Sequence, residues 1–167
     1  CKSYIDAITP NICVHCNQNI KIPKLLELAK ELSCDYVATG HYARIRKEND
    51  RYILTEAIDS WKDQSYMLHR LKQEELSKLI FPLGDYKKQD IKTLMQENGF
   101  EQVAKKRESY GVCFLGNETY QDFLLRRNPE LSNLKQGKIV NENNEVVGSH
   151  DGYPFYTIGQ YKSLKTT

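Results

Sequence analysis

The sequence predicts an α/β fold over residues 1–116 and a smaller, β-rich part over residues 117–167. Two observations support the α/β fold. Apolar side chains recur at helical spacing over residues 22–32, and a short β-prone run follows directly at residues 35–39. After Gly137 the pattern changes to short β-prone runs separated by turn residues, which is typical of hairpins. The domain boundary is therefore placed near residue 117.

Each element of the first part follows from a local pattern. A helix over 20–32 tolerates Pro23 because the proline lies near its start. The strand over 35–39 ends at Gly40 and His41, and ligands of open α/β sheets bind at the carboxyl ends of strands. The other predicted elements are a hairpin over 42–46 and 52–55, a helix over 62–71, a further turn or two over 74–79, and a helix from 85 or 86 to 98 with Gly99 as its cap.

The second part is predicted as one short helix followed by strands. A helix over 118–127 is stopped by Asn128 and Pro129. A hairpin over 138–140 and 145–147 follows, and residues 150–158 add another strand or two. Because the first part lacks an opening strand and the last part stops amid strands, we expect the chain to be an internal piece of a larger protein.

Composition excludes several classes of protein. The net charge of +2 is too balanced to indicate nucleic-acid binding from bulk charge alone, although a local basic face is compatible with it. No apolar run is long enough to span a membrane, and no stretch resembles a signal peptide. The five cysteines are odd in number and lack the spacing of a secreted disulfide framework, so we expect a reducing, cytoplasmic location.

The cysteines allow several interpretations. Cys13 and Cys16 form a C-x-x-C pair, which has three interpretations. The pair is half of a zinc site that needs two further ligands, a redox pair at a helix N-terminus, or two incidental cysteines in a loop. Cys113 lies in a glycine-flanked apolar stretch, which suits either a buried structural thiol or a thiol on a moving loop. Cys34 leads into a strand and is predicted to belong to the core.

An ordered series of short motifs resembles the tRNA-specific 2-thiouridylases over nearly the whole chain. Each motif is weak alone, but agreement of many in order is specific. The motifs are Thr9-Pro10-Asn11, Cys16-Asn17, Ile20-Lys21, Ala38-Thr39-Gly40-His41-Tyr42, Lys62-Asp63-Gln64-Ser65-Tyr66, Phe81-Pro82-Leu83-Gly84, Gly111-Val112-Cys113-Phe114-Leu115-Gly116, His150-Asp151-Gly152 and Tyr156-Thr157-Ile158-Gly159-Gln160.

The resemblance implies an ATP-dependent enzyme that replaces the 2-oxygen of the wobble uridine of tRNA with sulfur. It implies that residues 1–116 are the second half of a Rossmann-like, adenine-nucleotide alpha hydrolase-like domain with a parallel sheet. Residues 117–167 then form an incomplete central tRNA-binding domain. The family's Ser-Gly-Gly-x-Asp-Ser loop and C-terminal barrel do not occur in these residues. We therefore expect the chain alone to bind ATP weakly and to be inactive.

Sulfur transfer of this kind needs two thiols. Adenylation turns the uracil 2-oxygen into a good leaving group, a cysteine persulfide supplies the sulfur, and a second thiol then breaks the S–S bond. By resemblance, Cys113 carries the persulfide and Cys16 is the nucleophile that resolves it. ATP, Mg²⁺, tRNA and a sulfur donor (a cysteine desulfurase or a relay carrier) are the implied cofactors and partners, with no metal site in the protein.

The resemblance also implies binding residues. Gly40 lies against ATP, where glycine permits close approach, and His41 contacts tRNA. Lys62, Asp63 and Gln64 form a tRNA-contacting segment. Taken without the resemblance, the same segment suits a solvated helix start.

Asn11, Ile12 and Cys13 occupy the stretch that meets the target base in the family. The family usually has a carboxylate where this chain has Cys13, so an acid–base role there is in doubt. On an irregular loop only one of Cys13 and Cys16 can be well placed toward Cys113, whereas a helical turn would bring them together. Two other functions remain open: a C-x-x-C redox or zinc-binding module, and a non-catalytic tRNA-binding relative.

Overall fold

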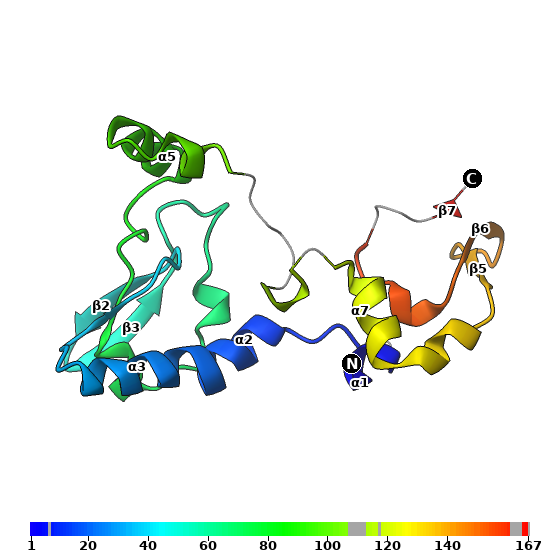
Figure 1. Cartoon of the computed structure of the whole chain (residues 1–167), viewed down its shortest axis with the longest axis horizontal. Helices are drawn as coiled ribbons and strands as arrows, with labels where there is room; N and C mark the ends of the chain where they lie inside the picture. The colour runs from blue at the N-terminus through cyan, green and yellow to red at the C-terminus, as the bar shows by residue number, and fades with distance from the viewer. Residues whose placement is uncertain (7, 107–112, 117, 161–164, 167) are drawn as a thin grey trace. The chain divides into compact units, whose positions relative to one another are not determined.

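The chain forms two compact units in a computed structural model that describes residues 1–6, 8–106, 113–116, 118–160 and 165–166. One unit is Ile12–Tyr110, and the other combines Cys1–Asn11 with Gly111–Thr167 (Figure 1). Each unit has its own hydrophobic cluster. An α/β part is followed by a smaller part that holds a three-stranded sheet, as the sequence predicts.

The unit Ile12–Tyr110 contains helices, a parallel strand pair and a hairpin. Its elements are α2 Ile12–Cys16, the π-helix η1 Asn17–Lys21, α3 Ile22–Glu31, β1 Val37–Ala38, β2 Arg44–Glu48, β3 Arg51–Thr55, the 3-10 helix η2 Ser65–Met67, α4 Gln73–Leu76, β4 Leu79–Ile80, α5 Lys88–Glu97 and α6 Glu101–Ala104. Its core is formed by Ile22, Val37, Ala43, Leu68, Leu71, Leu76, Leu79 and Phe81.

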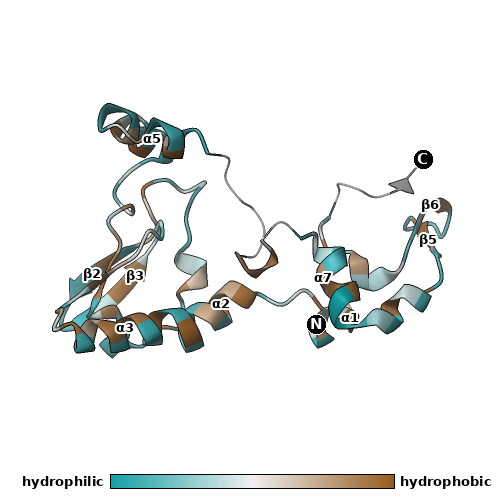
Figure 2. Ribbon diagram, viewed as in Figure 1, coloured by the Kyte–Doolittle hydropathy of each residue, from teal (hydrophilic) through white to brown (hydrophobic). Residues whose placement is uncertain are grey.

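One continuous helix opens this unit, because the backbone stays helical at both junctions between α2, η1 and α3. The predicted helix over 20–32 is confirmed near its end but begins earlier, at Ile12. In the π-helical turn the Ile22 N–H donates to the Asn17 carbonyl, one residue further back than in an α-helix. This wider turn accommodates Pro23, which has no N–H of its own to donate. Figure 2 shows hydrophobic and hydrophilic residues alternating along α3.

The parallel strands β1 and β4 carry the candidate site. Val37 pairs with Leu79 and Ala38 with Ile80, and Val37 and Leu79 are the buried members. The predicted strand over 35–39 is confirmed in shortened form. Its partner β4 was not predicted, because a two-residue strand is too short to show a period. The carboxyl ends of the two strands lead into Gly40 and Phe81.

The predicted hairpin is confirmed as β2 and β3, which pair in antiparallel register from Arg44–Thr55 to Glu48–Arg51. Asn49 and Asp50 form the turn with φ angles of 45° and 62°. These two residue types tolerate positive φ better than other non-glycine residues, and the resulting turn matches the twist of the strands.

The predicted helix over 62–71 is wrong. Only Ser65–Met67 form a short 3-10 turn there. Asp63 accepts hydrogen bonds from the Ala57 N–H (2.8 Å), the Ser65 N–H (3.2 Å) and the Ser65 hydroxyl (2.6 Å). Such side-chain bonds to nearby backbone compete with the helical pattern.

Gly84 makes a backbone contact that no other residue permits. A Cβ atom there would lie 1.9 Å from the Ala43 carbonyl oxygen, and backbone cannot rotate out of the way. We expect Gly84→Ala to lower the free energy of unfolding by about 3 kcal/mol or more. Urea unfolding checks this result. Gly40→Ala is the matched control, since a Cβ at Gly40 meets only Leu83 Cδ1 at 3.8 Å. Equal stability of the two variants would contradict the steric argument.

The second unit is built from α1 Lys2–Ile5, η3 Cys113–Leu115, α7 Tyr120–Arg127, η4 Pro129–Asn133, β5 Gly137–Val140, β6 Val146–His150, η5 Tyr153–Phe155 and β7 Lys165–Thr166. The predicted helix over 118–127 is confirmed as α7, which Thr119 and Asp122 cap reciprocally. The predicted hairpin is confirmed as β5 and β6, and β7 extends the sheet beside β6.

The strand prediction over 150–158 is wrong beyond His150. Tyr153–Phe155 form a 3-10 turn instead, with Pro154 at its start and Gly152 at a φ of 138°. Phe155 joins Leu124 and Leu131 in the core of this unit, so its apolar character reflects burial beside α7 rather than a strand.

Candidate active site

His41 lies at the carboxyl end of β1 and is one of two buried polar residues among those described. Its Nδ1 is 2.7 Å from the Thr39 hydroxyl, and its Nε2 is 3.3 Å from the Lys21 ammonium. The ring of Phe81, which follows β4, meets it edge to face at 5.9 Å. Contacts from the opening helix and both parallel strands therefore hold the imidazole in place.

These contacts define the protonation state of His41. The Lys21 ammonium can only donate, so Nε2 must accept and the single ring proton resides on Nδ1, facing Thr39. Burial, and secondly the charge of Lys21, lower the pKa of His41 to about 4. The imidazole is therefore neutral at physiological pH.

We expect this neutral histidine to make stability depend on pH. In the unfolded chain the histidine protonates near its ordinary pKa of 6.5, whereas in the folded chain it protonates only near 4. Acid thus favours the unfolded state, and stability should fall by about 2 kcal/mol between pH 6.5 and pH 4. Urea unfolding of wild type and His41→Gln across this range tests the effect. An identical pH slope in both would contradict it.

The predicted segment Lys62, Asp63 and Gln64 lies beside His41. The side-chain oxygen of Gln64 accepts the Tyr42 N–H (3.0 Å), and the Gln64 N–H donates to the Tyr42 carbonyl (2.7 Å). Both oxygens of Asp63 accept hydrogen bonds within the same loop. The Asp63 carboxylate and the Gln64 side-chain oxygen are therefore already occupied by hydrogen bonds that fix the conformation of this segment.

Cys13 and Cys16 lie on α2, both half-buried and unbridged. The next residue, Asn17, is buried, and its side-chain amide donates to the Met67 carbonyl of η2 (3.3 Å). Burial raises the pKa of Tyr66 on η2, as do the nearby Cys13 and Asp63. The two thiols therefore adjoin the turn that continues the Lys62–Gln64 segment.

The remaining predicted residues are divided between the units. Cys113 opens η3, is exposed and belongs to the unit that also contains Asn11, whereas Ile12 begins the other unit. The prediction that Cys34 belongs to the core is wrong, since it is exposed just beyond α3. Its thiol donates only a weak bond to the Leu32 carbonyl.

Gly40 is exposed, and its neighbourhood is open. A Cβ atom built there would make one ordinary contact, with Leu83. The fold of this unit therefore does not by itself require glycine at this position. Open space over the end of a parallel strand is where α/β folds admit a nucleotide.

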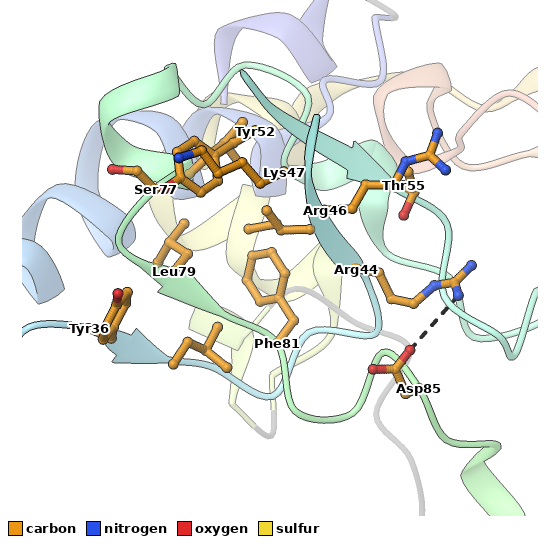
Figure 3. A pocket seen from close by; sticks show the side chains of 13 residues that line it. Tyr36, Arg44, Arg46, Lys47, Tyr52, Thr55, Ser77, Leu79, Phe81 and Asp85 are labelled. Carbon is orange, nitrogen blue, oxygen red and sulfur yellow. Dashed lines mark ion pairs between the residues drawn. The ribbon is translucent and has the colours of Figure 1, made fainter. Parts of the chain in front are cut away.

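A separate pocket of about 570 Å³ lies between the β2–β3 hairpin and β4, and none of the predicted site residues lines it (Figure 3). Its cations each have an acidic partner. Arg44 faces Asp85 (3.9 Å), Arg46 pairs with Glu48 (3.0 Å), and Lys47 with Asp50 (3.5 Å). This balance does not favour a phosphate site in the pocket.

Sequence reasoning overlooked Trp61. Its side chain is 95% exposed, directly before the Lys62–Gln64 segment, and it is the only tryptophan of the chain. An exposed large aromatic beside a lysine is a feature that RNA-binding surfaces use for base stacking. The signal was available in the sequence as a tryptophan between polar residues.

Within the described ranges, neither a metal-binding cluster nor a membrane-spanning helix occurs. No three or more cysteine, histidine or acidic residues gather there in a group able to hold a metal ion. No helix in that part of the chain is long and apolar enough to cross a membrane.

The fold and site define an α/β domain with Gly40 and His41 at the carboxyl end of a parallel strand, and a small domain with an antiparallel sheet. Residues 1–117 match the family model described as the tRNA methyl transferase HUP domain, and residues 121–166 match the tRNA methyl transferase PRC-barrel domain. The chain belongs to this family.

Curated relatives share nearly the whole chain. A protein of Cytophaga hutchinsonii named tRNA-specific 2-thiouridylase MnmA is 48% identical over 167 residues, covering 99% of this chain and 45% of the relative. Proteins of the same name from Amoebophilus asiaticus and Salinibacter ruber are 47% and 48% identical, over 98% and 96% of this chain and 44% and 43% of their own lengths. The chain thus spans less than half the length of these relatives.

Proposed function

We propose that the full-length protein transfers sulfur to C2 of the wobble uridine in tRNA, in an ATP-dependent reaction. The observation that carries the proposal is 48% identity, over 99% of this chain, to a protein named for that activity, with both candidate cysteines present. The fold supports it because His41, Lys62–Gln64, Cys13 and Cys16 belong to one unit, joined by the contacts described above.

The proposed chemistry assigns each cysteine one step. The uridine 2-oxygen attacks ATP and becomes an AMP ester, with pyrophosphate as leaving group. The terminal sulfur of a Cys113 persulfide attacks C2, and AMP departs with the former uridine oxygen. Cys16 thiolate then attacks the Cys113 sulfur, which releases the thiolated base and leaves a Cys16–Cys113 disulfide. An external dithiol reduces the disulfide and becomes a disulfide itself, after which a sulfur-donor protein reloads Cys113.

The binding residues have separate proposed roles. Gly40 admits the nucleotide, and neutral His41, with Lys62 and Gln64, contacts tRNA, while Asn11, Ile12 and Cys13 face the target base. No cluster of acidic residues suited to Mg²⁺ occurs among the described residues, so no step is assigned to that ion. The cytoplasm is the proposed location.

Product analysis distinguishes the enzyme from the alternatives. With tRNA, ATP and a persulfide donor, we expect the full-length protein to release AMP and pyrophosphate only when tRNA is present. A non-catalytic relative would bind tRNA without releasing either product. Stoichiometric zinc, with no tRNA-dependent release, would identify a metal-binding module instead and refute the proposal.

Gly40→Ala tests the proposed nucleotide contact. Because the added Cβ meets only Leu83 at 3.8 Å, we expect nearly unchanged stability. In the full-length protein the same methyl group would occupy space needed by ATP and should weaken ATP binding about tenfold or more. Calorimetric titration with ATP measures the loss. Unchanged affinity in a stably folded variant would remove Gly40 from the site.

A further inference from the structure

The two cysteines of α2 are one helical turn apart. In an α-helix, residues three positions apart lie on the same face, and their Cα atoms are about 5 Å apart. A disulfide requires a Cα separation of about 4.4–6.8 Å, which Cys13 and Cys16 meet, and their Cβ atoms must approach from about 5–6 Å in a regular helix to about 4 Å. Both thiols are half-buried, whereas Cys1, Cys34 and Cys113 are exposed (Figure 1 shows α2).

The surrounding structure fixes the helical turn that carries Cys13 and Cys16. The helix continues without a break through η1 into α3, and Asn17 anchors it to η2 immediately after Cys16. Tyr66 of η2 lies close enough to Cys13 to interact with it electrostatically. Burial, Cys13 and Asp63 raise the pKa of the Tyr66 phenol.

We propose that Cys13 is a further catalytic thiol, which regenerates Cys113 by forming a Cys13–Cys16 disulfide. This inference rests on the proposed function. After sulfur transfer, the Cys13 thiolate attacks Cys16 Sγ in the Cys16–Cys113 disulfide. A Cys13–Cys16 bond forms, and the Cys113 thiolate leaves with the electron pair of the broken bond. Cys113 is then free to accept sulfur, and an external dithiol reductant later returns Cys13 and Cys16 to thiols while becoming a disulfide itself.

The relay has a chemical advantage over direct reduction. Because Cys13 is held one turn from its target, its attack is intramolecular and does not depend on the concentration of reductant. Cys113 becomes available for reloading before the reductant arrives. A serine or carboxylate at position 13 cannot perform this step.

The first arm of the test needs no turnover. Full-length Cys113→Ser is equilibrated in glutathione buffers of graded potential, free thiols are alkylated, and peptides are mapped by mass spectrometry. We expect a Cys13–Cys16 bridge to form in preference to any bond involving Cys34. If Cys13 and Cys16 are both alkylated, or carry only glutathione, across buffers that oxidise ordinary dithiols, the proposal is overturned.

The second arm follows one turnover without reductant. Wild type should end with a Cys13–Cys16 bridge and an alkylatable Cys113, whereas Cys13→Ser should end with a Cys16–Cys113 bridge. Cys34→Ser is the matched control and should resemble wild type. If wild type also ends with a Cys16–Cys113 bridge, Cys13 takes no part in regenerating Cys113 and the proposal is overturned. If wild type makes no thiolated tRNA, the proposed function fails, while the first arm still decides whether the dithiol forms.

Discussion

Cys113→Ser in the full-length protein is expected to abolish tRNA thiolation. A serine hydroxyl cannot hold a transferable sulfur atom, so the loss should reach about 10³-fold or more in rate. Cys113 is exposed in η3, where no packing depends on its sulfur. Affinity for tRNA should therefore stay within about twofold of wild type. Nucleoside analysis and a filter-binding assay measure the two quantities.

The control for this result is Cys34→Ser, since Cys34 is also exposed and has no proposed role. It should retain wild-type rate and affinity. If Cys113→Ser still thiolates tRNA when supplied by a protein persulfide donor, Cys113 is not the sulfur carrier. If it loses tRNA binding as well, its role is structural rather than chemical.

Cys16→Ala is expected to eliminate turnover, whereas Cys13→Ala should only slow it. Cys16 is the proposed nucleophile that releases the product, and it directly precedes the buried Asn17. Cys13 acts after product release in the proposed relay, so its loss should reduce steady-state turnover by about 3- to 10-fold. Single-turnover and steady-state assays of both variants separate the two effects. Full activity of Cys16→Ala would transfer the resolving role to Cys13.

The candidate site shows which parts of a structure a sequence can reveal. Gly40 and His41 were placed at a strand end from the β-prone run before them, and the strand is there. The hairpin was predicted from the β-prone runs at 42–46 and 52–55, and Asn49 and Asp50 between them tolerate the positive φ angles of its turn. These predictions succeeded because the determining interactions are local.

The failures arose where distant residues decide local structure. Residues 62–71 have helical spacing, but Gln64 bonds to Tyr42, which lies 22 positions away in the chain. The neutrality of His41 depends on Lys21, twenty residues away in the chain. The strand β4 exists through its pairing with β1. No local pattern encodes such contacts.

The helical placement of the C-x-x-C pair also changed its interpretation. From the sequence alone, both an irregular loop and a helical turn were open around these cysteines, and on a loop Cys13 and Cys16 would compete for one position. The structure begins α2 at Ile12, so the two thiols share one helix face. This placement allows both thiols to take part in the thiol–disulfide exchange proposed above.

The central claim is that the full-length protein replaces an oxygen of tRNA uridine with sulfur at the expense of ATP. The most direct measurement is mass spectrometry of nucleosides from tRNA incubated with the protein, ATP and a persulfide donor. We predict 2-thiouridine at the wobble position with ATP, and none without ATP or with Cys113→Ser. Tight tRNA binding and a fully loaded Cys113 persulfide, without any thiolated nucleoside, would contradict the account.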